Sequence, residues 1–297
     1  MSGGGCFVGR PKNGANGSQK IGGWVLVTGA SAGIGRELAR AFASRRYDLV
    51  LAARTETAIE ALARNLVETH AVRVKTLPVD LSLPGAPQAM AEALTGAGVE
   101  VGVLVNNAGV LDEGPFAAGS LDAQLNLLQV NVVALTALTR LFLPAMTSRG
   151  EGRILNVASI AAFMPIPQLA VYAASKAFVL SLTEAVGEEV RGTGVTATAL
   201  CPGLTDTAMM RGSSLAQPVP ATMMMSPKDV AEAGCAACLR GEAICVPGLA
   251  NKLITGGAPL VPKALVRAIG GAMNGGGWER LAGALQGLAG KSGRPKG

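Results

Sequence analysis

Residues 24–35 read WVLVTGASAGIG, an apolar run that leads into a glycine-rich turn. The run predicts a buried strand, and a helical pattern begins directly after the turn. Gly29, Gly33 and Gly35 would allow a tight turn and a close approach of phosphate groups, to which the helix N-terminus would offer free N–H groups. The spacing differs from the common G-x-G-x-x-G pattern. We interpret the segment as a phosphate-binding turn, and a turn that serves packing alone is the alternative.

Short β-branched runs alternate with helical patterns along the rest of the chain. Strands separated by helix-length segments indicate βαβ units with right-handed connections. The sequence therefore predicts an α/β fold, a Rossmann-like doubly wound parallel sheet of about seven strands flanked by helices, in a single domain. The predicted strands are 24–28, 48–53, 72–79, 101–105, 153–158, 195–201 and 243–246, and the predicted helices between them include 35–46, 56–69, 84–97, 121–149 and 171–191.

The composition favours a large buried core and a reducing compartment. Of the 297 residues, 49% are hydrophobic. No stretch approaches the roughly 20 apolar residues of a membrane span, so none is expected. The first residues show no charged start followed by an apolar run, and secretion is therefore not expected. The five cysteines, an odd number, favour the cytoplasm or another reducing compartment.

The net charge of +6 is concentrated at the two ends of the chain. Residues 1–22 carry three basic residues and no acid, and residues 251–297 carry seven basic residues against Glu279. The body between them is left with a charge of −3, so a nucleic-acid-binding face is not expected. We predict a flexible basic leader at 1–22, a Rossmann-fold catalytic domain at 23–250 and a basic, partly helical extension at 251–297.

His70 is the only histidine of the chain. Catalysis by Ser-His-Asp or Cys-His groups is therefore excluded, and no metal site is expected. Cys235 and Cys238 have CxxC spacing but lie in an alanine-rich helical stretch. Buried helix packing is the favoured interpretation of this pair, over a redox or metal-binding role.

Tyr172 and Lys176 are four residues apart, a spacing that places both side chains on one face of a helix. A phenol has an ordinary pKa of about 10, and lowering it to about 7 requires roughly 4 kcal/mol. An ammonium about 4 Å away at an effective dielectric near 20 supplies roughly that amount. The pair is therefore a candidate general acid/base, and chance spacing is the alternative.

The second predicted strand is followed by Arg54. An acidic residue at this strand end would hydrogen-bond the ribose hydroxyls of NAD, whereas an arginine can pair with the 2′-phosphate of NADP. Asp48 lies at the opposite end of the strand, where it cannot take the acidic role. The sequence thus favours NADP(H) over NAD(H), with a solvated Arg54 as the alternative.

Polar or small residues follow the other predicted strands as well. Asp80 and Leu81 come after the third strand, in a position suited to an adenine amino group. Asn131 lies inside a predicted helix, where asparagine is neither a good helix former nor easily buried without a partner. The remaining strand-end residues are Asn107, Ala108, Gly109, Ser159, Pro202, Gly203 and Thr207.

These motifs, in this order and spacing, resemble the short-chain dehydrogenase/reductase family in its NADP-preferring soluble form, over about residues 24–248. None of the motif positions departs from the family pattern, but many NADP-preferring members carry a second basic residue inside the glycine-rich turn, and Ser31-Ala32 does not. The resemblance implies a catalytic tetrad of Asn131, Ser159, Tyr172 and Lys176. It places around the cofactor Gly29, Ser31, Gly33, Ile34, Gly35, Arg54, Asp80, Leu81, Asn107, Ala108, Gly109, Tyr172, Lys176, Pro202, Gly203 and Thr207.

The resemblance also implies a role for each member of the tetrad. Tyr172 would donate a proton to a carbonyl oxygen that Ser159 orients. Lys176 would lower the Tyr172 pKa and hold the nicotinamide ribose, and Asn131 would anchor a water that connects Lys176 to solvent. We therefore expect an oxidoreductase that transfers a hydride between NADP(H) and a carbonyl or secondary alcohol. The alternatives are a non-catalytic NADP-binding sensor or scaffold, and a dehydratase- or epimerase-like relative.

The substrate side of the predicted site is rich in flexible apolar residues. Family members place a mobile lid between Gly203 and Pro227, and residues 163–166 would form the opposite apolar wall. We expect an apolar ketone or ketoacyl substrate, and core packing of a short helix pair is the alternative for this segment. Half of the ten methionines lie there, namely Met209, Met210, Met223, Met224 and Met225.

The segment after Gly248 resembles the branch of the family that includes long-chain ketoacyl reductases and hydroxysteroid dehydrogenases. Its apolar residues are spaced like one helix face. This face could dock on the body or on a second subunit, or make peripheral membrane contact. Relatives pair through the two long helices that here carry Asn131 and Tyr172, so a homodimer or homotetramer is expected.

Overall fold

The computed structural model describes residues 20–213, 224–248 and 251, and the predicted extension at 251–297 lies almost wholly outside this part. Its seven strands form one parallel sheet in the order β3-β2-β1-β4-β5-β6-β7. The predicted fold class and every predicted strand are confirmed, with ends that differ by a few residues. The strands are β1 (Trp24–Thr28), β2 (Leu49–Ala53), β3 (Val74–Pro78), β4 (Val101–Asn106), β5 (Gly152–Val157), β6 (Val195–Leu200) and β7 (Ile244–Cys245).

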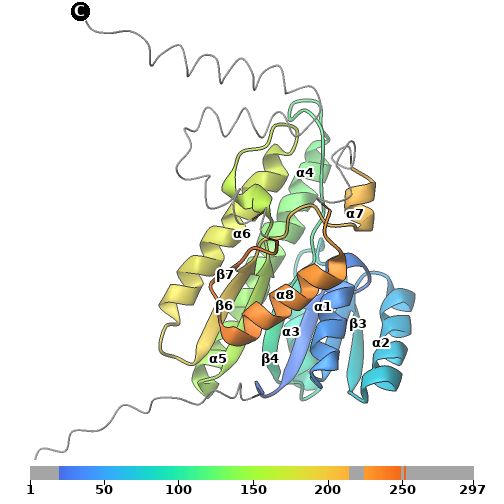
Figure 1. The fold of residues 1–297 in the computed structure, drawn as a ribbon, viewed down its shortest axis with the longest axis vertical. Coiled ribbons are helices and arrows are strands. Elements are labelled where there is room, and N and C mark those ends of the chain that lie inside the picture. The colour runs from blue at the N-terminus through green and yellow to red at the C-terminus, as the bar shows by residue number, and fades with distance from the viewer. Residues whose placement is uncertain (1–19, 214–223, 249–250, 252–297) are drawn as a thin grey trace, which may run out of the picture.

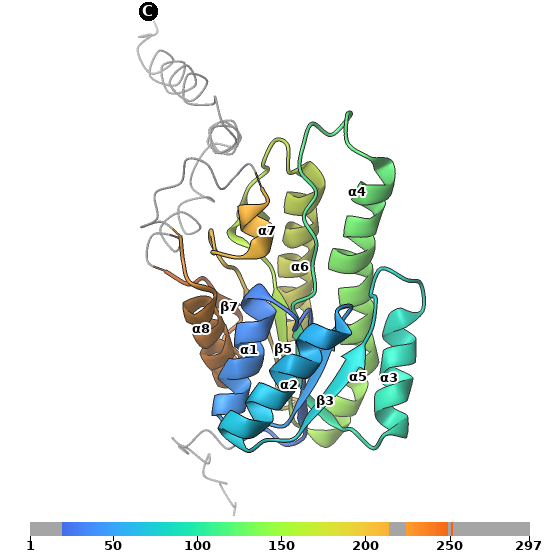
Figure 2. The same ribbon diagram turned by 90° about the vertical axis from the view of Figure 1, so that its right-hand side faces the viewer.

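Helices cover both faces of the sheet, as Figures 1 and 2 show from two directions. One face packs its buried residues against α1, α2 and α8, and the other packs against α3, α5 and α6. The helical elements are α1 (Gly33–Ser44), α2 (Glu56–His70), α3 (Ala86–Gly96), α4 (Leu121–Leu128), η1 (Gln129–Ala134), α5 (Leu135–Arg149), η2 (Ile160–Phe163), α6 (Ala170–Glu189), α7 (Ala208–Arg211) and α8 (Pro227–Arg240).

The strand order reverses beside β1. This strand pairs with β2 on one side and with β4 on the other, in both cases parallel. The chain runs outward from β1 to β3 and then crosses back to β4 before it continues to β7. Such a reversal separates the loops at the carboxyl ends of β1 and β4 and opens a crevice between them. The fold thus brings the loops after β1 and β4 to the edge where a ligand is expected.

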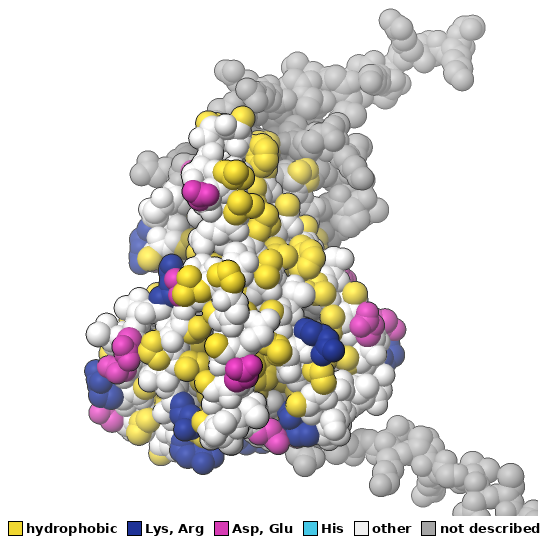
Figure 3. All heavy atoms as spheres, turned by 180° about the vertical axis from the view of Figure 1, so that it is seen from behind, with side chains coloured by type: hydrophobic (Ala, Val, Ile, Leu, Met, Phe, Trp, Pro, Cys, Tyr) yellow, Lys and Arg dark blue, Asp and Glu magenta, His cyan; other side chains and the backbone are white. Residues whose placement is uncertain are grey.

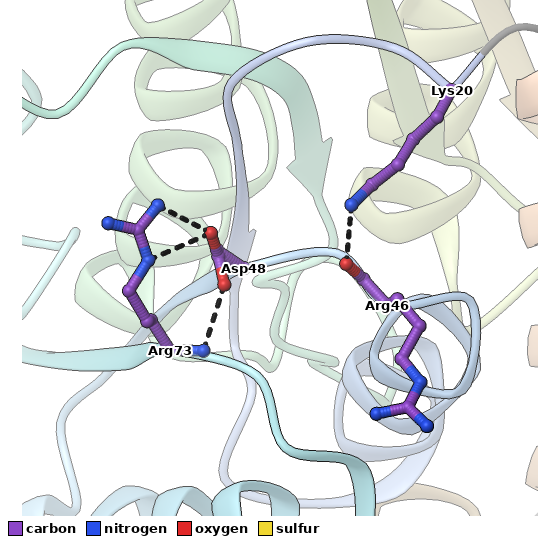
Figure 4. A network of polar contacts seen from close by, with 4 residues as sticks. All are labelled: Lys20, Arg46, Asp48 and Arg73. Atoms are coloured by element: carbon purple, nitrogen blue, oxygen red, sulfur yellow. Dashed lines mark hydrogen bonds and ion pairs between the residues drawn. The ribbon is translucent and has the colours of Figure 1, made fainter.

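Polar contacts tie the opposite, amino-terminal end of the sheet together (Figure 4). The Asp48 carboxylate, just before β2, accepts hydrogen bonds from the backbone N–H of Arg73 at 2.8 Å and from its Nη2 at 2.7 Å. Lys20 Nζ donates to the carbonyl oxygen of Arg46 at 2.6 Å. Burial alone would raise the Asp48 pKa, but the hydrogen bonds from Arg73 hold it below its ordinary value. Asp48 therefore has a structural role, far from the ligand edge.

The predicted helix at 121–149 is divided by a π-helical segment. Residues Gln129–Ala134 form η1 between α4 and α5, and Asn131 lies within it. A π-helical turn inside an α-helix is uncommon and frequently marks a functional site, because it displaces one side chain from the regular helical spacing. The periodicity of the sequence predicted the helix but not this interruption.

The same helix changes one expectation about membranes. Among the described residues, Leu121–Arg149 is long and apolar enough to cross a membrane by length and composition alone, with a hydropathy of 1.5 in its most apolar window. The expectation that no stretch approaches such a span was therefore wrong. Buried core helices of soluble proteins meet the same criteria, and α5 packs against the sheet through Leu138 and Met146.

The CxxC pair on α8 has the predicted packing role. Cys235 and Cys238 are fully buried and belong to the core between α8, α1 and the sheet. Burial raises the pKa of the Cys235 thiol to about 12 and that of Cys238 further. Cys235 and Cys238 are both free thiols. Both thiols of the pair thus serve as small apolar side chains.

Candidate active site

A crevice of about 350 Å³ lies at the carboxyl edge of the sheet, between the loops that follow β1 and β4. Three of the four predicted catalytic residues line it, Ser159, Tyr172 and Lys176, whereas Asn131 lies behind its wall. All of the residues predicted to contact a cofactor line the same crevice. They are Gly29, Ser31, Gly33, Ile34, Gly35, Arg54, Asp80, Leu81, Asn107, Ala108, Gly109, Tyr172, Lys176, Pro202, Gly203 and Thr207.

The turn between β1 and α1 presents a helix N-terminus to the crevice. Helix α1 begins at Gly33, its first turn carries no acidic residue, and the side chain of the preceding Ala32 does not cap it. Gly33 has a φ of +55°, and a Cβ there would lie 3.2 Å from the Thr207 methyl group. The first N–H groups of α1 therefore have no side-chain cap, and the positive φ of Gly33 is one that residues with a side chain rarely adopt. This cradle fits an anionic phosphate group.

Thr28 organises the turn, and the sequence analysis did not identify it. Its hydroxyl is buried, donates to the carbonyl oxygen of Val105 at 3.2 Å and accepts from the N–H groups of Asn107 and Ala108, both at 3.0 Å. Asn107 Nδ2 in turn donates to the carbonyl oxygen of Thr28 at 2.9 Å. These bonds hold the loops after β1 and β4 together. The sequence feature that could have identified Thr28 is its position as a polar residue at the end of an apolar strand.

Arg54 and Asp80 lie at the far end of the crevice, after β2 and β3. Arg54 is exposed, so its guanidinium is accessible to a ligand. Hydrogen bonds from Ser82, first from its backbone N–H, lower the Asp80 pKa, and the charge of Arg54 adds to the effect. Asp80 is therefore a stable carboxylate acceptor beside a cation. The Asp80 carboxylate can bind an amino group, and the Arg54 guanidinium can bind a phosphate.

Ser159, Tyr172 and Lys176 meet at the other end of the crevice. Ser159 follows β5, and its Oγ accepts from the N–H of Ala161 at 3.1 Å. Tyr172 lies in the first turn of α6, and Lys176 follows one turn later. Lys176 Nζ lies 5.7 Å from the centroid of the Tyr172 ring and donates to the carbonyl oxygen of Val157 at 2.9 Å.

The pKa of each group departs from its ordinary value, chiefly because of burial. Burial raises the pKa of the Tyr172 phenol, and a hydrogen bond with Ser159 opposes this rise. Burial lowers the pKa of Lys176 to about 8. Lys176 was expected to lower the Tyr172 pKa, but in this structure the pKa of Tyr172 is raised. The ammonium is directed to the Val157 carbonyl, and desolvation of the phenol outweighs the remaining attraction.

Asn131 connects the π-helical segment to the loop after β4. Its Oδ1 accepts from the N–H of Val110 at 2.9 Å, and its Nδ2 donates to the carbonyl oxygen of Val110 at 3.0 Å. The side chain is buried, so these bonds supply the partners that a buried amide needs. Asn131 is thus behind the crevice and close to Lys176, because a Cβ on Gly109 would lie 3.3 Å from Asn131 Oδ1 and 3.6 Å from Lys176 Nζ.

The crevice beside Tyr172 is walled by apolar side chains, which differ in part from those predicted. Ile166 lines it as expected, but Phe163, Met164 and Pro165 do not. Met164 packs inward instead, in a cluster with residues at the start of α6. Met209 and Met210 line it from α7. Met223 lies outside the described residues. The apolar residues that line this end are Leu111, Ile160, Ala161, Ile166, Leu169, Leu204, Met209 and Met210.

A doubly wound sheet, a glycine-rich turn before an uncapped helix N-terminus and a Ser-Tyr-Lys cluster at one carboxyl edge are the arrangement expected of a dinucleotide-dependent oxidoreductase. The family model for short chain dehydrogenase matches residues 23–218. The chain belongs to the short-chain dehydrogenase family. This confirms the predicted family and favours an enzyme over a non-catalytic sensor on the same fold.

Curated relatives and solved structures agree with this assignment. The chain is 34% identical over 213 residues to the very-long-chain 3-oxoacyl-CoA reductase of Rattus norvegicus, covering 70% of this chain and 68% of that protein. It is 35% identical to the ketoacyl reductase HetN of a Nostoc strain, covering 70% and 72%. The matched segment spans only 62% of the Mus musculus 3-oxoacyl-CoA reductase.

Two solved structures share the fold over nearly their whole length. The short-chain dehydrogenase from Sphingobium yanoikuyae in complex with NADPH has a TM-score of 0.70 and 31% identity, covering 92% of this chain and 97% of that chain. The bulky-bulky ketone specific alcohol dehydrogenase from Comamonas testosteroni has a TM-score of 0.69 and 26% identity, covering 93% and 96%. An NAD(P) cofactor is therefore supported.

Proposed function

We propose that the protein is an NADPH-dependent reductase of apolar ketones or ketoacyl thioesters. The observation that carries this proposal is the Ser159–Tyr172–Lys176 cluster at one end of a crevice whose walls there are apolar. The names of the rat and Nostoc relatives agree with a ketoacyl substrate. The four proposed catalytic residues are Asn131, Ser159, Tyr172 and Lys176.

The side chains of the cluster divide the work of a carbonyl reduction. When bound, the nicotinamide supplies the hydride to the carbonyl carbon. Ser159 donates a hydrogen bond to the carbonyl oxygen and holds it beside Tyr172. The O–H bond of Tyr172 breaks as its proton moves to that oxygen, which leaves a phenolate next to the Lys176 ammonium. Lys176 and the Gly109 turn would hold the nicotinamide ribose.

The proposal is tested by the consumption of NADPH with a series of ketoacyl thioesters of increasing chain length. Each buried methylene contributes about 0.8 kcal/mol, so kcat/KM should rise several-fold per methylene until the apolar wall is filled. A short, charged keto acid is the matched control and should react slowly. Equal turnover of the short charged ketone and the long apolar one would contradict the proposed substrate class.

The proposed preference for NADPH over NADH rests on Arg54. Hydrogen bonds to charged groups contribute about 1.5–3 kcal/mol, so Arg54→Ala should weaken NADPH binding by about 10- to 100-fold and leave NADH binding almost unchanged. Titration of each reduced cofactor by fluorescence measures this. Arg64→Ala removes an exposed arginine from α2, the helix that follows Arg54, and is the control because Arg64 lies outside the crevice. An equal loss for both cofactors would contradict the assignment.

The pKa of Lys176 predicts a fall in activity at alkaline pH. Its pKa of about 8 means that the ammonium is charged below that pH and neutral above it. Since the charged form holds the ribose and stabilises the phenolate, kcat/KM for reduction should fall about tenfold per pH unit above about 8. Lys176→Met should have low activity, and its kcat/KM should not show this fall at alkaline pH. A flat wild-type profile between about pH 7 and 9.5 would contradict the role of the charged ammonium.

We also propose that the protein forms a homodimer or homotetramer through its two long helices. Exposed apolar residues lie on these helices, among them Val133 on η1, Leu141 on α5 and Phe178 on α6. Figure 3 shows apolar side chains gathered along the upper part of the far face, with most charged side chains below. Sedimentation velocity tests this by comparing the oligomeric state of wild type with that of Phe178→Glu.

We also propose a cytoplasmic location and a peripheral membrane contact of the extension at 251–297. Cell fractionation tests both.

A further inference from the structure

Ser175 is a buried hydroxyl that none of the roles above uses. It directly precedes Lys176 on α6, and only 1% of its surface is exposed. Its Oγ donates to the carbonyl oxygen of Tyr172 at 2.7 Å and accepts from Asn131 Nδ2 at 3.3 Å. One hydroxyl therefore contacts the backbone of the proton donor and the amide of the π-helical segment.

The Asn131 amide extends this contact to the loop after β4. Its two atoms bind both backbone groups of Val110, which lines the crevice. Gly109, immediately before Val110, approaches both the Asn131 amide and the Lys176 ammonium. The side chains of Asn131 and Ser175 thus join three segments that are far apart in sequence, namely residues 109–110, 131 and 172–176.

The pairing fixes the position of each segment relative to the other two. The π-helical turn places Asn131 off the regular helical spacing, so its orientation depends on side-chain partners rather than on the helix itself. Val110 satisfies the Asn131 Oδ1, but Nδ2 is shared between Val110 and Ser175. Without the Ser175 hydroxyl, Asn131 would still bind Val110 but would no longer be tied to the helix that carries Tyr172 and Lys176.

We propose that Ser175 is a positioning residue. Its hydroxyl acts as a lock that holds Asn131 and the Val110 loop against α6. The lock keeps the carbonyl, Tyr172 and the nicotinamide ribose site in a fixed arrangement. The consequence for turnover rests on the proposed reductase function. The lock itself is a property of the fold and can be measured without turnover. Ser175 does not line the crevice, so it acts through Asn131 and the backbone of α6.

A double-mutant cycle on kcat tests the proposal. Ser175→Ala should lower kcat by about tenfold, as expected for one buried hydrogen bond at a reacting site. In an Asn131→Ala background the same change should cost less than about twofold, because the partner is already absent. Ser175→Thr keeps a hydroxyl that can bond the carbonyl three residues earlier, and it should restore most of kcat. A loss of equal size in both backgrounds would overturn the proposal.

Ser181→Ala is the matched control, because it removes a hydroxyl from an exposed position of the same helix. It should leave kcat unchanged, and a loss equal to that of Ser175→Ala would show that general destabilisation of α6 is the cause. Denaturant unfolding of each variant establishes that it is folded at the assay temperature. If Ser175→Ala does not fold, Ser175→Cys, which retains only a weak donor, takes its place in the cycle.

Amide hydrogen exchange separates this inference from the proposed function. The Val110 N–H should exchange about tenfold faster in Ser175→Ala than in wild type, because its acceptor Asn131 is less firmly held. The rate in Ser181→Ala should match wild type. An unchanged Val110 rate in Ser175→Ala would overturn the lock. If the wild type reduces no carbonyl, the proposed function fails, and the exchange rate still decides the role of Ser175.

Discussion

Tyr172→Phe should lower kcat for carbonyl reduction by about 10²- to 10⁴-fold, the usual contribution of a positioned proton donor. The change retains the ring, which packs with Ile166 and Leu169, and removes only the ionisable oxygen. NADPH affinity should therefore change by less than about threefold, because the variant deletes no charged contact. Single-turnover oxidation of bound NADPH measures the chemical step without product release.

The chain supplies its own control, since Tyr47 is the only other tyrosine. Its hydroxyl accepts from the N–H of Ile21 at 3.2 Å, at the opposite end of the sheet from the crevice. Tyr47→Phe removes the same oxygen from a buried position, so it should cost about 1 kcal/mol of stability and leave kcat unchanged. If Tyr172→Phe turned over at the wild-type rate, Tyr172 would not be the proton donor.

Most of the fold and much of the site could be predicted because both depend on strand ends. Parallel strands place all of their carboxyl ends at one edge, so residues such as Gly29, Arg54 and Ser159 must lie near one another once the strands are known. The strand ends can be read from apolar runs and glycine-rich turns. Tyr172 and Lys176 could be added because helical spacing sets which side chains share a face.

The features that were not predicted depend on side-chain packing, which the periodicity of the sequence does not reveal. The π-helical turn carries Asn131, whose amide is bound on one side by Val110 and on the other by Ser175. The pKa of Tyr172 is raised and not lowered, because desolvation depends on the whole crevice and not on the nearest charge. Met164 faces inward for a similar reason, since the loop after Ser159 turns through η2 before α6 begins.

Gly35→Ala should damage both the stability and the cofactor binding of the protein, although it adds a single methyl group. A Cβ at Gly35 would clash with Asn107 Nδ2 and with the backbone carbonyl oxygen of Gly29, both of which are fixed by the loops after β1 and β4. Overpacking of this kind costs about 1–3 kcal/mol. Because the displaced atoms shape the phosphate cradle, NADPH affinity should fall by about 10- to 100-fold, equivalent to one lost charge-assisted hydrogen bond.

Gly96→Ala is the matched control for that substitution. Gly96 ends α3, and a Cβ there would meet no atom within 4 Å. Alanine is the better helix former by about 1 kcal/mol, so this variant should be as stable as wild type or slightly more stable, with unchanged NADPH affinity. Urea unfolding and cofactor titration compare the two variants directly. Equal behaviour of Gly35→Ala and Gly96→Ala would mean that the turn can move, and that close packing against Asn107 does not set the cradle.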